Sequence, residues 1–104
     1  MPVTPQDRGN EFTREHGCTE AEWLRCLPGA VGSARWALLR PGKARVALPS
    51  GGTLTLRWHA LPPRRIASIS MPRMSVHYFF DGVDLDARET FIHHFDLYLQ
   101  RGGG

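Results

Sequence analysis

Three groups of side chains have the types needed to bind a metal or to catalyse a reaction. In the first, Glu89, His93 and Asp96 follow one another at i, i+4 and i+7, on one face of a helix if the C-terminal segment is helical. A single helix rarely completes a coordination sphere, and the sequence does not show ligands from another segment. We interpret these residues as the solvated face of a helix, and we predict neither a metal nor a cofactor.

The two cysteines form the second group. Cys18 and Cys26 lack the close pairing of structural zinc sites, even with His16 nearby. Eight residues of helix would separate them by about 12 Å, too far for a disulfide. We therefore expect reduced thiols in a cytoplasmic protein. Neither a signal peptide nor a run of about 18 apolar residues is present, so we expect no membrane partner.

The third group has the residue types of a hydrolytic triad: the serines around Ser75, with His77 and Asp81. None of these serines lies in a G-x-S-x-G nucleophile elbow, and no glycine-rich phosphate loop occurs. A chain of 104 residues also has little room to enclose a deep pocket. The sequence therefore predicts a binding protein and not an enzyme.

Basic residues are concentrated in the middle of the chain. The 13 Lys and Arg exceed the 10 Asp and Glu by only three charges, yet no acidic residue occurs between Trp23 and Phe80. All ten carboxylates therefore lie in the two terminal segments. A surface built from the middle segment would have a positive potential that attracts phosphates or acidic proteins.

Capping signals and apolar periodicity predict two helices. Thr19 followed by Glu22 is a capping-box sequence, and we expect a short helix that ends at Pro28. A longer helix is expected to begin at Asp84, with Phe91 and Phe95 on its apolar face.

Alternation of apolar and polar residues predicts the strands. They are expected at residues 35–39, 44–48, 54–58, 64–70 and 73–80. Leu61-Pro62-Pro63 is expected to break the ladder, because proline lacks an amide donor. In the strand that follows, Ala67 and Ile69 are expected to point inward, and Pro72 to interrupt the chain again.

Short strands joined by tight turns pair antiparallel, and the apolar face of the resulting sheet needs a cover. The expected fold is therefore α+β, a two-layer sandwich with a meandering antiparallel sheet of about four to five strands. A short N-terminal helix and a longer C-terminal helix cover one face. Residues 1–17 are expected to be a flexible N-terminal arm, and residues 18–104 a single domain.

The strand alternation also assigns the side chains of the face that the helices leave open. The expected anion-binding residues are Lys43, Arg45, Arg57, His59, Arg73, His77 and Phe79. With no carboxylate among the outward side chains, this face would hold an acidic protein surface or a nucleic acid. Two alternatives stay open: a face that is merely solvated, and a homodimeric interaction protein with no anion site, favoured by Leu97 on the polar side of the last helix.

Two segments carry a resemblance. LPPRRIA at residues 61–67 and FDLYLQRGGG at residues 95–104 resemble small conserved-hypothetical proteins of GC-rich proteobacteria. The resemblance covers about the last half of the chain. It implies a bacterial source, and it implies no activity, cofactor or binding residue.

Overall fold

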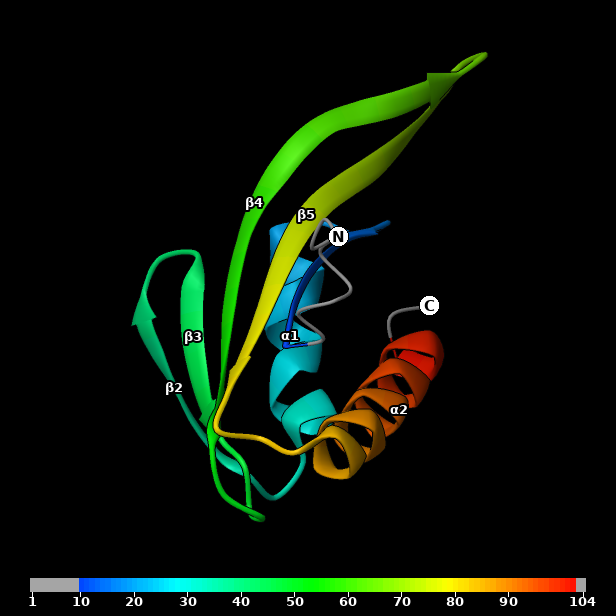
Figure 1. Cartoon of the computed structure of the whole chain (residues 1–104). Helices are drawn as coiled ribbons and strands as arrows, with labels where there is room; N and C mark the ends of the chain where they lie inside the picture. Colours follow the sequence, from blue (N-terminus) through cyan, green and yellow to red (C-terminus); the bar gives the residue numbers. More distant parts are fainter. Residues whose placement is uncertain (1–9, 103–104) are drawn as a thin grey trace, which may run out of the picture.

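The structure is a computed structural model and describes residues 10–102. Five strands and two helices follow one another along the chain (Figure 1). Their bounds are β1 Glu11–His16, α1 Glu20–Val31, β2 Arg35–Arg40, β3 Lys43–Ala47, β4 Thr53–Ile66, β5 Ile69–Asp81 and α2 Leu85–Gly102.

The five strands form one antiparallel sheet in the order β1-β5-β4-β3-β2. Strands β2 to β5 are consecutive hairpins, and β1 is added beside β5. Both helices lie on the same face of the sheet (Figure 1). The predicted two-layer α+β fold is confirmed. No helix within the described range is long and apolar enough to cross a membrane.

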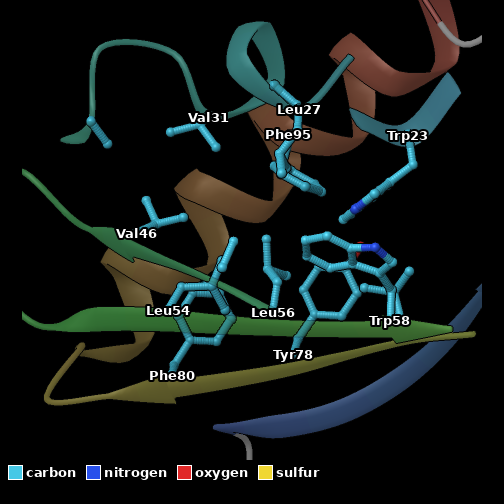
Figure 2. Close-up of a cluster of buried hydrophobic side chains, with 14 of the residues drawn as sticks. Trp23, Leu27, Val31, Val46, Leu54, Leu56, Trp58, Tyr78, Phe80 and Phe95 are labelled. Carbon is cyan, nitrogen blue, oxygen red and sulfur yellow. The ribbon is translucent and has the colours of Figure 1, made fainter. Parts of the chain in front are cut away.

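One hydrophobic core joins the two layers (Figure 2). Phe95 of α2 is fully buried, with its ring 6.0 Å from that of Trp23 and 5.9 Å from that of Tyr78. These edge-on contacts connect α2 with α1 and β5. The sheet contributes Val46, Leu54, Leu56, Trp58, Val76, Tyr78 and Phe80. Because these buried residues alternate along their strands, the residues between them point to the open face.

Helix α1 begins as predicted but ends later. The Glu22 amide donates to Thr19 Oγ1 at 3.1 Å and the Thr19 amide to Glu22 Oε1 at 2.9 Å, which completes the capping box. The expected end at Pro28 is wrong, because the helix continues to Val31. Proline removes only one amide donor there, while the next turn buries Ala30 and Val31.

The expected N-terminal arm is partly wrong. Residues 11–16 form strand β1, whereas residues 1–9 of that arm lie outside the described residues. Phe12 pairs with Tyr78 in the register, and their rings stack at 4.7 Å. Arg14 donates to Asp96 of α2 at 2.6 Å. Strand β1 is therefore fixed by contacts that are distant in sequence.

The prolines do not end the β4–β5 ladder. Pro62 and Pro63 lie opposite Pro72 at a register shift, and pairing resumes from Arg64 to a two-residue turn at Ala67 and Ser68. The predicted strand at residues 64–70 is thus two strands joined by a tight turn, and Ala67 adopts a positive φ of 55° there. The expected inward orientation of Ile69 is also wrong, because this side chain is exposed.

Candidate anion-binding site

The seven predicted site residues lie on strands β3, β4 and β5 and face away from the helices. They are Lys43, Arg45, Arg57, His59, Arg73, His77 and Phe79, all exposed or half-buried. Each alternates with residues that are buried on the other side of the sheet. Their surroundings differ from strand to strand, however, and this divides the seven into two groups.

One group belongs to a row of basic side chains that runs across the sheet. Lys43 lies directly opposite Arg57 of β4, and on its other side it lies opposite Arg40 of β2. We refer to Arg40, Lys43 and Arg57 as the cationic row. Arg45, two residues along β3, lies on the same face. Neighbouring strands are about 4.8 Å apart, so the backbones of the row span only about 10 Å.

A shallow depression of about 420 Å³ is lined by Arg40 and Arg57 of this row, whereas Lys43 does not line it. Its polar walls are formed by Thr13, Arg40, Arg57, His59, Ser75 and His77. Two of these side chains are already engaged, because Thr13 Oγ1 lies 3.0 Å from His77 Nδ1 and Glu11 Oε2 lies 2.9 Å from His77 Nε2. Arg40, Arg57, His59 and Ser75 remain as possible donors, and no carboxylate lines the depression. The depression therefore combines the charge and the donor groups that an oxyanion requires.

The turn between β2 and β3 brings Arg40 to the site. The amide of Trp58 donates to the carbonyl of Gly42 at 2.9 Å, which holds this turn against β4. Gly42 has a φ of 84°, and a Cβ atom there would lie 3.0 Å from the Trp58 carbonyl oxygen. Glycine is thus required at this position both by its positive φ and by the close approach of the Trp58 carbonyl oxygen. Arg40 is not among the site residues predicted from the sequence, although its place before Pro41-Gly42 indicates a turn.

The second group is neutralised by carboxylates. The prediction that the open face has none is wrong, because β1 places Glu11 and Glu15 beside β5. His77 Nε2 lies 2.9 Å from Glu11 Oε2, and Arg73 contacts Glu15 through two nitrogens. The hydrogen bond from Arg73 lowers the pKa of Glu15 below its ordinary value. Phe79, opposite Glu11 in the register, also belongs to this neutralised half of the face.

The β2–β4 half of the face keeps its charge. Among residues 10–102, the ion pairs involve none of Arg40, Lys43, Arg45 and Arg57. His59 also lies on this half, two residues along β4 from Arg57 and opposite Ser75. The geometry therefore reduces the predicted site to Lys43, Arg45, Arg57 and His59 and adds Arg40.

The structure also places the metal-ligand and cysteine candidates of the sequence. No three metal-ligating side chains of the described chain are close enough to hold an ion. Asp96 is paired with Arg14, at 2.6 Å. Cys18 and Cys26 are free thiols, and burial raises the pKa of Cys18. A raised pKa disfavours the thiolate, so Cys18 is a poor nucleophile.

No family model matches the chain, and no curated protein matches it.

Proposed function

We propose that this protein binds an anionic macromolecule through the cationic row and acts by binding rather than by catalysis. The observation that carries the proposal is the direct cross-strand pairing of Lys43 with Arg57, extended by the pairing of Arg40 with Lys43 beside a register shift in β2. Like charges directly opposite one another destabilise a sheet. An anion on the row would remove this repulsion and gain charge-assisted hydrogen bonds.

The ligand chemistry is that of a polyanion. Several cations on an open surface contact a series of phosphates or carboxylates more effectively than they enclose one small ion. A nucleic acid and an acidic protein both supply such a series. The shared prediction is an affinity that falls steeply with salt.

Titration at two salt concentrations tests the proposal. The probes are single-stranded and duplex oligonucleotides and poly-glutamate, and the readout is fluorescence anisotropy. We expect binding to at least one probe, with Arg57→Gln lowering the affinity about fivefold and, for a duplex, the salt slope by about 0.9. Arg25→Gln, on α1, is the matched control and should leave the affinity unchanged.

Three results would overturn the proposal. They are the absence of binding to every probe, an affinity that salt does not change, and an equal effect of Arg25→Gln and Arg57→Gln. Binding to oligonucleotides alone or to poly-glutamate alone identifies the class of partner.

A homodimer is the second candidate. Leu97 on α2 is 41% exposed on the otherwise polar side of the helix, and burying it in a two-fold interface would stabilise a dimer. Analytical ultracentrifugation of the protein and of Leu97→Ser tests this. A concentration-dependent dimer that the substitution weakens supports it, and a monomer at all concentrations rejects it.

A cytoplasmic location is part of the proposal. The free thiols Cys18 and Cys26 support it, because a reducing compartment keeps such groups reduced. Fractionation of the source cells, with the protein detected by antibody, is the measurement that decides it.

A further inference from the structure

The end of the β4–β5 hairpin projects beyond the rest of the domain (Figure 1). We call residues 62–72 the ribbon. Strand β3 pairs with β4 only as far as Arg57, and β1 pairs with β5 only as far as Met74. Beyond these positions the two strands pair only with each other. Apart from the half-buried Pro72, every residue of the ribbon is exposed.

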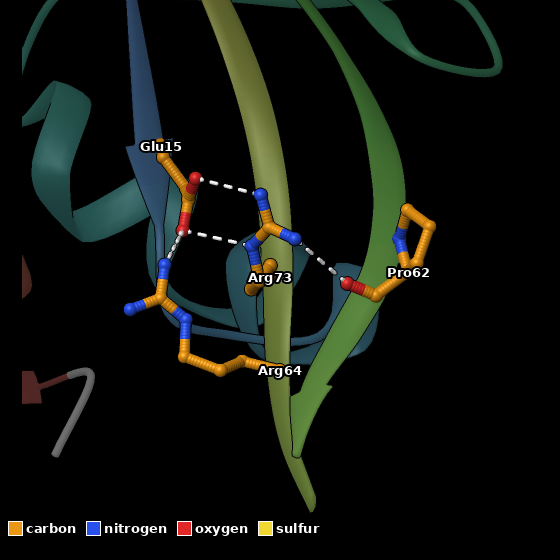
Figure 3. Close-up of polar contacts among 4 residues, drawn as sticks. All are labelled: Glu15, Pro62, Arg64 and Arg73. Carbon is orange, nitrogen blue, oxygen red and sulfur yellow. Dashed lines mark hydrogen bonds and ion pairs between the residues drawn. The ribbon is translucent and has the colours of Figure 1, made fainter. Parts of the chain in front are cut away.

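The base of the ribbon is fixed to the sheet (Figure 3). Arg73 donates to the carbonyl of Pro62 at 3.1 Å and to both oxygens of Glu15 at 3.0 and 3.1 Å. Arg64 reaches the same carboxylate, with Nη2 3.7 Å from Glu15 Oε2. One carboxylate of β1 thus joins both strands of the hairpin, so the ribbon is held in one direction relative to the domain.

The tip of the ribbon combines large aliphatic side chains with arginines. Ile66 lies opposite Ile69, and these side chains are 56% and 60% exposed. One step back along the same face, Met71 is 46% exposed and lies opposite Arg64. Arg65 projects from the other face of the ribbon, opposite Ser70. None of these three apolar side chains belongs to the hydrophobic core, and an exposed group of apolar side chains is typical of an interaction site.

The edges of the ribbon oppose its pairing with another strand. Pro62, Pro63 and Pro72 lack amide donors, and prolines on an edge prevent the addition of a further strand. The prolines therefore oppose the addition of a strand at the base of the ribbon, whereas residues 64–66 and 69–71 keep their amide donors. The remaining contact surface is the tip itself, which is narrow, apolar and flanked by positive charge.

We propose that the tip of the ribbon inserts into the interfacial layer of a membrane that contains anionic lipids. Arg64 lies two residues behind Ile66, or about 7 Å along the strand. Apolar groups at an interface insert about 5–10 Å, so Arg65 reaches the lipid phosphates when Ile66 and Ile69 reach the acyl boundary. Arg64 reaches them by exchanging its exposed 3.7 Å contact with Glu15 for a phosphate. Both ribbon edges carry backbone groups without a neighbouring strand, and these need water. Insertion therefore stops at the interface.

This contact is separate from the proposed polyanion site, because the cationic row and the tip share no residue. It differs from the sequence-based expectation that the protein has no membrane partner, which stays a prediction. A surface contact of this kind requires no membrane-spanning helix.

Cosedimentation of the full chain with vesicles tests the apolar part of the contact. The vesicles are phosphatidylcholine with or without phosphatidylserine. We expect partitioning to the anionic vesicles, and at least about tenfold weaker partitioning for Ile66→Ser/Ile69→Ser. Leu85→Ser is the matched control, because Leu85 of α2 is also 56% exposed but lies away from the ribbon. It should partition like the unchanged protein.

The charged part is tested by Arg65→Gln, with Arg35→Gln on the edge strand β2 as its control. We expect Arg65→Gln to weaken partitioning about fivefold on anionic vesicles only. Equal binding to both kinds of vesicle, or no effect of the double isoleucine substitution, overturns the proposal. The proposal is also overturned if the double isoleucine substitution leaves vesicle binding unchanged but weakens binding to a duplex oligonucleotide. The same holds if it leaves vesicle binding unchanged but dissociates a dimer. Circular dichroism and urea unfolding confirm that each variant is folded.

Discussion

Glu15 accepts two hydrogen bonds from the guanidinium group of Arg73, at 3.0 Å from Nε and 3.1 Å from Nη2. Glu15 comes from β1 and Arg73 from β5, so a carboxylate from the acidic N-terminal segment neutralises a cation of the acid-free middle segment. The pair divides the open face into a neutralised half on β1 and β5 and a cationic half on β2, β3 and β4.

Glu15→Gln should extend the cationic half. The substitution removes one negative charge and frees Arg73, so we expect polyanion affinity to rise about fivefold and its salt dependence to steepen. Anisotropy titrations against the probe that binds the unchanged protein measure this. Glu89→Gln, which removes the same charge from an exposed position on α2, is the control. An equal effect of both substitutions would mean that only net charge matters.

His16 should make folding stability depend on pH. Burial, and secondly the charge of Arg14, lower the pKa of His16 below its ordinary value, whereas Asp96 opposes the shift. The unfolded chain therefore binds a proton more readily than the folded one. We expect the free energy of unfolding to be greatest above pH 6.5 and to decrease as the pH falls through this value and below it.

Urea unfolding between pH 7.5 and 5 measures this effect. His16 Nε2 lies 2.9 Å from the hydroxyl oxygen of Tyr78, whose pKa burial raises, so the phenol stays neutral over this range. His16→Gln can keep a polar contact with Tyr78 and should show a smaller decrease in stability at acidic pH. His93→Gln, at an exposed site on α2, should behave like the unchanged protein. If the free energy of unfolding depends on pH in the same way in all three proteins, His16 is not the cause of the pH dependence.

The sequence predicts those parts of the fold that depend on local patterns. Alternation identifies the segments that become β2, β3 and most of β4 and β5, and the capping box locates the start of α1. These signals come from neighbouring residues, and they determine which side chains face the helices. For the same reason, the sequence correctly predicts that Lys43, Arg45 and Arg57 point to the face of the sheet away from the helices.

The remaining features depend on contacts between distant segments. Residues 11–16 have few apolar side chains, and they form a strand because Phe12 stacks on Tyr78 and Arg14 reaches Asp96. The continuation of α1 past Pro28 likewise depends on burial of its last turn. Without β1 in place, the two carboxylates of the open face cannot be predicted. The sequence therefore predicts one continuous anion-binding face that includes Arg73, His77 and Phe79, whereas Glu11 and Glu15 lie beside these three residues.

Thr19→Ala should destabilise the protein by about 1 kcal/mol, because it removes the side-chain acceptor of the capping box. Urea unfolding with a constant m-value measures the loss. Glu22→Ala removes the reciprocal acceptor, so the double substitution should cost less than the sum of the two single ones. Additive effects would show that the two hydrogen bonds act independently.

Shortening the ribbon should leave the domain intact. Leu61 and Arg73 are directly paired, so replacing residues 62–72 by Asn-Gly gives a two-residue hairpin turn at that point. The removed residues contribute nothing to the buried core, and the hydrogen bond lost from Arg73 to Pro62 is exposed. We expect the free energy of unfolding to change by less than about 1 kcal/mol. The shortened protein should also keep its affinity for polyanions and lose its affinity for anionic vesicles. A large loss of stability would show that the ribbon supports the fold, and retained vesicle binding would place the lipid contact elsewhere on the protein.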